Sequence, residues 1–542
     1  MTAPGTGPAA PAPGEARRDA PDAPGDGWLR LDPRNRLVAA VFLAGPPIIV
    51  ALVWLAWRGL VPSGLRWTIS SLGVTGMVVG AIALGEWFTV RYRVTAERLQ
   101  VRSGIVVRNH RSIPRDRIRS VDATASPLHR AFGLVTVKIG TGQHVGSGDE
   151  ELKLDGVSPA EADRLRTVLL YRAPSTRADG PEPRGAGAGG AAPPSSRTRA
   201  VAVLAPSWLR YAPLTVSALL GVFAILGAAY KPLDALGLGP RDIWRWGAVR
   251  GAVGEIRMVP LWLVIVTGVA AVVVLAVLGA TALYILTWWG FRLDDEGATW
   301  RTRRGLLTTR SVTLEKRRMR GVEIAEPLLL RAGRGARVNA VAVGLTSGSR
   351  DRNDNGGDTR ALLPPAPRAE ARRVATRVLG DDPMTIPLRP HPRRALRRRV
   401  NRAVAAVVAV AVVAAVLGVW WLPSWAWVCA VVLLPVLLPF AFDAYRSLGH
   451  EVTPAYLVTR FGTGVRRTVA LRRDGIIGWK ITRSPFQRRA GLATLAATTA
   501  ANDGAYRVRD VAPAAALDAA ERAVPGLLAP FVERTADRDT AG

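Results

Sequence analysis

The sequence predicts a membrane α-helical protein with six transmembrane helices and three α+β domains, each a small β-barrel or sandwich closed by a C-terminal helix. Three observations lead to this fold class. The chain of 542 residues carries a formal net charge of +31, yet 49% of its residues are hydrophobic. The hydrophobic residues gather in six long runs that occur in pairs. The hydrophilic segments after the three pairs share a repeated pattern, which indicates three copies of one structural unit.

The composition excludes several classes of protein. The chain has one cysteine, Cys429, which excludes a disulfide scaffold and a zinc site built from cysteines. Its five histidines contain no H-x-x-x-H pair, which argues against a histidine-rich metal site. So large an apolar fraction beside so much positive charge excludes both a disordered chain and an ordinary soluble enzyme.

Each of the six apolar runs is long enough to cross a bilayer, whose hydrocarbon core requires about 20 apolar residues in a helix. Tryptophans cluster at the ends of the runs, as expected for an interfacial aromatic belt. A set of buried core helices is the alternative, but no soluble fold needs six runs of this length. The predicted transmembrane helices are 37–57, 67–88, 212–230, 259–289, 403–422 and 425–444.

The distribution of arginine predicts the orientation of the chain in the membrane. Seven arginines and no acidic residue lie between positions 389 and 402, directly before the fifth run. Positive residues beside membrane helices are retained on the cytoplasmic side. We therefore expect a multi-pass protein of the plasma membrane, with both termini and all three hydrophilic domains in the cytoplasm.

A proline and two glycines recur at nearly fixed spacing in the three hydrophilic segments. A glycine lies 22 or 23 residues before the proline, and a second glycine lies six residues after it. The earlier glycine suits the turn of a β-hairpin, where a positive φ angle is needed. The repeat-signature residues are Gly104, Pro127 and Gly133 in the first copy, Gly305, Pro327 and Gly333 in the second, and Gly462, Pro485 and Gly491 in the third.

Each hydrophilic segment contains several short strands followed by one helix. Segments such as 99–102 and 134–139 largely alternate apolar and polar residues, which is typical of half-buried strands. The first segment then continues into Ser158-Pro-Ala-Glu161, a capping box that starts a helix over 162–171. Segments 368–379 and 514–523 are the equivalent helices of the second and third copies.

The first copy resembles a known family. Its Ile113-Pro-Arg-Asp-Arg-Ile-Arg-Ser-Val-Asp122, followed by Ser126-Pro-Leu-His-Arg-Ala-Phe-Gly-Leu134 and a strand, is similar to the bacterial pleckstrin-homology (bPH2) domain. Three such domains interleaved with helix pairs resemble the YdbT-like membrane proteins. The second copy departs from the pattern, with Glu315-Lys-Arg-Arg-Met-Arg320 in place of the Ile-Pro-Arg stretch. The resemblance implies pleckstrin-homology-like (PH-like) barrels and residence in a membrane, and it implies no reaction.

These patterns divide the chain into three units, each a helix pair with the PH-like domain that follows it. A tail rich in Ala, Pro and Gly (1–27) precedes the first unit. A flexible linker (173–206) and a basic juxtamembrane linker (381–402) separate the units, and a short tail (531–542) ends the chain. The helix pairs occupy 28–88, 207–289 and 403–445, and the PH-like domains occupy 89–172, 290–380 and 446–530.

Basic residues are the candidates for contact with lipid or with a partner. Anionic headgroups attract each juxtamembrane Lys or Arg by about 1 kcal/mol. The same charges could instead serve only to fix orientation, and this alternative stays open. Few aromatic residues accompany them, so we expect no nucleic-acid partner. The candidates are Arg91, Arg93, Arg102, Arg108 and Arg111 on the first strands, and Arg393, Arg394, Arg397, Arg398 and Arg399 before the fifth run.

No catalytic residues, cofactor or metal site are predicted. The segment Asp351–Gly356 matches the first half of a calcium loop, but Leu362 occupies the position of the bidentate Glu. We therefore predict a non-enzymatic membrane protein whose PH-like domains are interaction modules for anionic lipid, for another copy of the chain or for a partner membrane protein. The alternative is a transporter or an export-associated component, in which Glu86 and Asp443 at the inner ends of the second and sixth runs would carry function.

Overall fold

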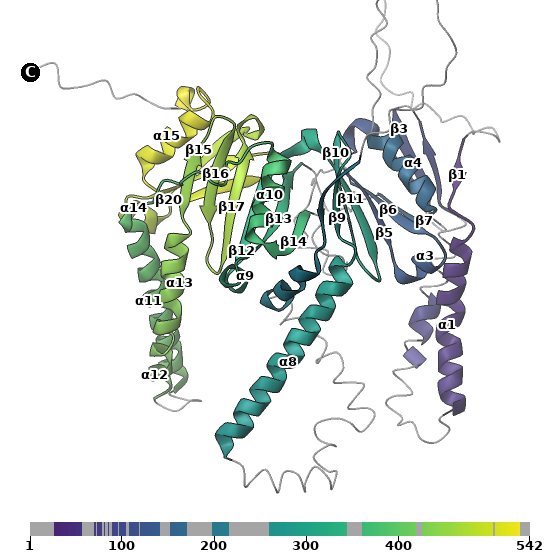
Figure 1. Cartoon of the computed structure of the whole chain (residues 1–542), viewed down its shortest axis with the longest axis horizontal. Helices are drawn as coiled ribbons and strands as arrows, with labels where there is room; N and C mark the ends of the chain where they lie inside the picture. Colours follow the sequence, from purple (N-terminus) through teal and green to yellow (C-terminus); the bar gives the residue numbers. More distant parts are fainter. Residues whose placement is uncertain are drawn as a thin grey trace, which may run out of the picture.

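The structure is a computed structural model of the whole chain (Figure 1). It describes residues 27–56, parts of 70–89, residues 90–140 apart from 96, 105–107 and 119, and then 152–170, 198–215, 260–343, 360–418, 425–501 and 504–531. The segment Asp351–Gly356 and Glu86 lie outside these residues.

The first unit consists of an apolar helix, two sets of strands and a closing helix. A 3-10 helix, Arg115–Arg117, separates the two sets of strands. The elements are β1 (Leu29–Arg30), α1 (Asn35–Ala56), β2 (Arg91–Val94), β3 (Arg98–Ser103), β4 (Asn109–Pro114), β5 (Ser120–Ala125), α3 (Pro127–Ala131), β6 (Val135–Gly140), β7 (Leu152–Val157) and α4 (Pro159–Leu170).

The second unit repeats this order, with the 3-10 helix at Lys316–Arg318. It begins earlier than the sequence indicates, because its first strand lies inside the segment expected to be a linker. A further 3-10 helix, Pro206–Leu214, follows that strand. The elements are β8 (Arg199–Val203), α8 (Leu261–Trp288), β9 (Arg292–Asp295), β10 (Thr299–Arg304), β11 (Thr309–Glu315), β12 (Met319–Pro327), α9 (Leu328–Ala332), β13 (Gly335–Ala342), β14 (Ala361–Pro367) and α10 (Arg368–Leu379).

The third unit again has the same order, with the 3-10 helix at Arg473–Gly475. A single bridge between Arg389 and His450 takes the place of its first strand. The elements are α11 (Arg393–Gly418), α12 (Ala426–Val431), α13 (Leu434–Arg446), β15 (Gly449–Val452), β16 (Tyr456–Phe461), β17 (Val465–Arg472), β18 (Gly478–Thr482), α14 (Pro485–Arg489), β19 (Ala493–Thr498), β20 (Ala505–Val511) and α15 (Pro513–Ala523).

The sheets run across the boundaries between units. The later strands of the first unit join the early strands of the second in one seven-stranded sheet, of order β7-β6-β5-β11-β10-β9-β8. The second and third units are joined in the same way by a six-stranded sheet, of order β14-β13-β12-β17-β16-β15. The four strands β1-β2-β3-β4 and the three strands β18-β19-β20 form separate sheets. The PH-like domains are therefore not separate barrels, because each unit shares a sheet with its neighbour.

The hydrophobic core of the second unit nevertheless consists of residues from that unit. In the second unit, Phe291 and Leu293 from the early strands pack with Val338 and Leu363 from the late strands, and Val374 of α10 packs beside them. These side chains are almost completely buried. The core thus lies between the two halves of a unit under its closing helix, although the two halves belong to different continuous sheets.

Two helices are long and apolar enough to cross a membrane, by length and composition: Val266–Trp288 within α8, and α11. In the most apolar 18-residue stretch of each helix, only 17% and 6% of the stretch is buried within the protein. Valines along them, such as Val274 and Val413, are more than half exposed. Helices so apolar on all sides, and so little covered by protein, need an apolar solvent. In Figure 1, α1, α8 and α11–α13 all extend from the same side of the sheets.

The prediction of six transmembrane helices is wrong, since the described residues contain two such helices. The sixth run is broken into α12 and α13 just before Pro435, whose ring removes a backbone donor. In the first run, the apolar stretch of α1 that the described residues establish is Asn35–Gly45, which is shorter than a membrane-spanning helix. The second and third runs lie largely outside the described residues. Hydropathy averaged over a window measures apolar content and does not show whether a helix continues.

Candidate functional site

A cavity of about 430 Å³ lies where the first unit meets the second. Its walls come from β5, α3 and α4 of the first unit, and from β10, β11 and the end of α8 of the second. One carboxylate, Asp163, lines it. Five arginines line it as well and give it a strongly basic lining: Arg130, Arg301, Arg303, Arg304 and Arg310.

The cavity lies at the end of a membrane helix because the β10–β11 hairpin folds back onto α8. The backbone N–H of Gly305 donates to the carbonyl of Trp289 over 2.8 Å, and the N–H of Leu306 donates to the carbonyl of Leu286 over 3.0 Å. Gly305 has a φ of 110°, and a Cβ there would lie 2.0 Å from the carbonyl oxygen of Thr308. Only glycine permits this turn, which holds the hairpin tip against Trp288 and Trp289 at the helix end.

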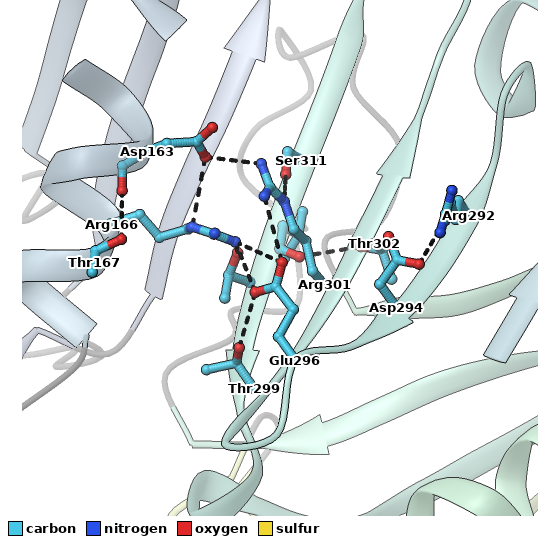
Figure 2. Close-up of polar contacts among 12 residues, drawn as sticks. Asp163, Arg166, Thr167, Arg292, Asp294, Glu296, Thr299, Arg301, Thr302 and Ser311 are labelled. Atoms are coloured by element: carbon cyan, nitrogen blue, oxygen red, sulfur yellow. Dashed lines mark hydrogen bonds and ion pairs between the residues drawn. The ribbon is translucent and has the colours of Figure 1, made fainter. Parts of the chain in front are cut away.

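An ion-pair network beside the cavity joins the two units (Figure 2), and three of its four charged side chains, Arg166, Glu296 and Arg301, are largely buried. Arg166 of α4 contacts Glu296 at 3.0 Å, and Arg301 of β10 contacts Asp163 of α4 at 3.0 Å and Glu296 at 3.5 Å. Arg301 also donates to Ser311 over 3.0 Å. Since removal of one partner from a buried pair leaves an uncompensated charge, this network holds the junction in one geometry.

Burial, followed by the nearby positive charges of Arg166 and Arg303, lowers the pKa of Arg301, and Asp163 and Glu296 oppose that shift. A guanidinium keeps its proton even so. Arg303 lines the cavity and is exposed, and Arg304 stacks on the ring of Trp288 at 4.3 Å. The cavity therefore offers fixed positive charge that suits an anion with several oxygens, such as a phosphate.

At the junction between the second and third units, an arginine equivalent to one that lines the cavity pairs with a carboxylate. Alignment of the units on their 3-10 helices makes Arg331 the equivalent of Arg130. Arg331 pairs with Asp443, and Glu326 pairs with Arg368 at 2.9 Å. In the first junction, the positions of Glu326 and Asp443 are occupied by Ala125 and Leu286. The first junction thus lacks the two carboxylates that the second junction uses.

Asp443 was a candidate for the alternative, transport-related function. It lies near the end of α13, with Arg466 at 3.9 Å in addition to Arg331. Its partners therefore come from the domains of two units, and the neighbouring Arg446 is not among the ion pairs it makes. This arrangement is a charge pair at the base of the helix.

The candidate arginines of the first strands lie away from the cavity, on the sheet β1-β2-β3-β4. Arg91 and Arg93 are on β2, Arg102 is on β3 and Arg111 is on β4, with Arg108 in the preceding turn. Arg102 stacks over the ring of Trp28 at 4.4 Å.

The candidate arginines of the juxtamembrane block occupy the first turns of α11. Arg393, Arg394 and Arg397 are exposed. Arg398 and Arg399 instead contact Asp510, whose side chain is 3% exposed, with the second contact at 2.9 Å. These two arginines join α11 to the third unit's sheet.

The repeat-signature glycines before the prolines share one conformation, with φ angles of 115°, 110° and 131° at Gly104, Gly305 and Gly462. This confirms the positive φ expected for the hairpin turn. Pro127 and Pro485 begin α3 and α14, and Pro327 lies one position earlier, as the N-cap of α9.

The second signature glycine is displaced in the second unit. Gly133 and Gly491 have φ angles of 66° and 63°, and the equivalent residue is Arg334, with a φ of 57°. Gly333 precedes that position. Alignment of the units on their prolines therefore matches Gly333 to Gly133 and Gly491, whereas the backbone conformation matches Arg334 to them.

None of the five arginines of the cavity was among the candidates. One signal in the sequence could have identified Arg303 among them: an arginine stands two residues before the first signature glycine in every unit, at Arg102, Arg303 and Arg460. The sequence could not show that strands from two units bring these residues together.

Within the described residues, no three His, Cys, Asp or Glu side chains lie close enough to hold a metal ion.

Comparison with known proteins gives one family and two relatives. The family model for the bacterial PH domain (bPH_2) matches residues 26–173, 249–381 and 402–522. The UPF0699 transmembrane protein YdbT of Bacillus subtilis is 21% identical over 430 residues, which cover 78% of this chain and 82% of that protein. The UPF0699 transmembrane protein YdbS of the same organism is 32% identical over 106 residues, 20% of this chain and 60% of that protein. No solved structure matches this chain significantly.

Proposed function

Because this chain belongs to the bacterial PH domain family and is YdbT-like, we propose that it is a non-enzymatic membrane protein whose PH-like domains bind anionic lipid headgroups at the membrane surface. The cavity between the first and second units is the proposed binding site. We place the domains on the cytoplasmic face of the plasma membrane, where anionic lipids and the arginines of α11 would meet.

One observation carries this proposal: five arginines surround a cavity at the end of α8. Trp288 and Trp289 mark the end of that helix, where aromatic side chains lie at the level of headgroups. A basic pocket beside a membrane helix at this depth is suited to a phosphate-bearing headgroup.

The test uses the full chain in detergent, titrated with phosphatidylglycerol or phosphatidylcholine and followed by native mass spectrometry. Arg303 is exposed at the cavity, so Arg303→Gln removes one charge without emptying a buried site. One arginine near an anionic headgroup contributes about 1 kcal/mol, so the affinity for phosphatidylglycerol should fall about fivefold. Arg377→Gln, at an exposed position in the last turn of α10, is the matched control and should leave that affinity unchanged.

Three outcomes would contradict the proposal. The first is equal retention of phosphatidylcholine, and the second is an Arg303→Gln protein that binds phosphatidylglycerol as the wild type does. The third is competition by inorganic phosphate at the same concentration as the lipid, because the cavity would then be a site for a soluble anion.

A further inference from the structure

The two junctions between units are built from equivalent strands in the same register. At the first junction β5 pairs antiparallel with β11, and Val121 lies opposite Thr313. At the second junction β12 pairs antiparallel with β17, and Val322 lies opposite Ala470. Alignment of the units on their 3-10 helices makes Val121 equivalent to Val322, and Thr313 equivalent to Ala470. The chain therefore uses one mode of edge-to-edge association twice.

The two strands that would form a third junction of this kind lie at the ends of the molecule. β4 is the first unit's equivalent of β11 and β17, and β18 is the third unit's equivalent of β5 and β12. Each is the edge of its sheet and, among the described residues, is paired on one side only. The first unit and the third unit lie at opposite ends of the molecule (Figure 1), so the two edges do not meet within one chain.

We propose that β18 of one molecule pairs with β4 of a second copy of this chain, head to tail. Pairing in the register of the two internal junctions would place Gly478 opposite Ile113, Ile481 opposite His110 and Thr482 opposite Asn109. The sheets would join in the order β20-β19-β18-β4-β3-β2-β1, three strands added to four as in the sheet between the first two units. Such a contact is heterologous, so it generates a ring or a filament.

Exposure of apolar side chains beside β18 favours an occupant there. Ile477, Ile481 and Phe486 are 67%, 42% and 71% exposed around this edge. An open strand edge bordered by apolar side chains is a template for pairing with another chain. Pro114, which has no N–H to donate, lies just beyond the proposed pairs and would not interrupt them.

One pair in the proposed register opposes association and gives a test of it. Lys480 would lie opposite Arg111, whereas the residues equivalent to Lys480 are Asp122 and Glu323. Like charges directly opposite each other weaken a strand pair. The contact between molecules is therefore weaker than the contacts within the chain, and it responds to charge at these two positions.

The first experiment is cysteine cross-linking of the full chain in native membranes, in a Cys429→Ser background. Two populations with different tags are co-expressed, one with His110→Cys and the other with Ile481→Cys. Opposed residues on antiparallel strands have Cβ atoms about 5 Å apart, so a mixed-tag adduct should form under mild oxidation. The control replaces Ile481→Cys with Lys480→Cys, one residue out of register and on the other face of the strand. It should give at most about a tenth of the adduct.

The second experiment measures the concentration dependence of multimers of the solubilised chain by mass photometry. Lys480→Glu should strengthen association about fivefold, and Arg111→Glu should do the same. The two changes together should return association to the wild-type level, since two acidic residues then face each other.

Several outcomes would overturn the proposal. The edges would not meet head to tail in this register if the two cysteine pairs gave equal amounts of cross-linked dimer. The same conclusion would follow if His110→Cys alone gave cross-linked dimer. Protection of both edges from hydrogen exchange in membranes, without any adduct between copies, would mean that another protein covers them. Neither experiment depends on lipid binding at the cavity, so its failure is distinct from failure of the proposed function.

Discussion

Two buried histidines of the third unit are in contact with each other. His391 and His450 are 6% and 3% exposed, and Nε2 of His391 lies 3.1 Å from Nδ1 of His450. Nδ1 of His391 lies 3.2 Å from the backbone carbonyl of Asp510, to which it can donate. One imidazole can donate to the other only if the acceptor ring is neutral, so this arrangement disfavours protonation of both rings.

We predict that the stability of the third unit falls as the pH drops from about 6.5 to about 4. Burial, followed by the charge of His391, lowers the pKa of His450 to about 4. Glu451 opposes that shift, and Arg389 and Arg522 add to it. The unfolded chain takes up the proton at about 6.5, so the folded state is fully stabilised above that value. The loss by pH 4 is about 3 kcal/mol.

The measurement is the melting temperature of the solubilised full chain at pH 7 and at pH 4.5, followed by protease resistance of the third unit. His450→Leu copies the residue at the equivalent position of the second unit, Leu293. This variant should lose less stability on acidification than the wild type. An equal decrease in both proteins would show that the histidine pair is not the cause.

Arg398 and Arg399 show what the sequence could not predict at the scale of single residues. Their position before an apolar run made them candidates for lipid contact. In the structure both contact Asp510, more than 100 residues away in the chain. Charge density along a sequence identifies a basic segment, but the partner that neutralises each charge depends on tertiary contacts.

At the scale of elements, the turn after the short helix of each unit needs one residue with a positive φ. Glycine occupies this position in the first and third units, and Arg334 occupies it in the second. A left-handed conformation costs a residue with a Cβ roughly 1 kcal/mol relative to glycine. The second unit therefore retains a strained residue that the other two avoid.

We predict that Arg334→Gly raises the stability of the second unit by about 1 kcal/mol, because glycine removes the strain at this turn. Arg334 is exposed, so the change removes no buried contact. The measurement is the denaturant concentration at which the second unit becomes sensitive to protease. Gly133→Ala should lower the stability of the first unit by a similar amount. A neutral or destabilising effect of Arg334→Gly would contradict the prediction.

The sequence predicted the elements of the domains better than those of the membrane. Alternating residues on β3 and β6 and the capping signals of α4 are local, and so the strand and helix assignments there agree with the structure. The sixth apolar run contains prolines that divide it, as at the start of α13. Average hydropathy does not register such a break, because proline counts as one residue in the window.

At the scale of the whole molecule, shared sheets make three repeats into one continuous body. The strands β5 and β11 come from different units, and so do β12 and β17. The choice of partner strand is not encoded within either strand, because any half-buried strand of suitable pattern can pair with it. The sequence could therefore predict three similar domains, but it could not predict that they associate edge to edge or that a basic cavity forms between them.

The continuous body also constrains orientation, because α8 and α11 leave it on the same side (Figure 1). α8 ends at the sheets with Trp288, and α11 begins at the sheets with exposed arginines such as Arg393 and Arg397. Positive residues at the end of a membrane helix stay in the cytoplasm. We therefore predict that all three PH-like domains face the cytoplasm.

Single cysteines at positions 180, 385 and 540, in a Cys429→Ser background, test this orientation with a membrane-impermeant maleimide. The three sites lie after the first domain, after the second domain and near the C-terminus, so each reports on a different domain. All three should react only after the cells are made permeable. A cysteine placed in an extracellular loop of a known membrane protein serves as the positive control for intact cells. Labelling of any of the three sites in intact cells would place a domain outside, and a sheet shared by neighbouring units could not then form across the membrane.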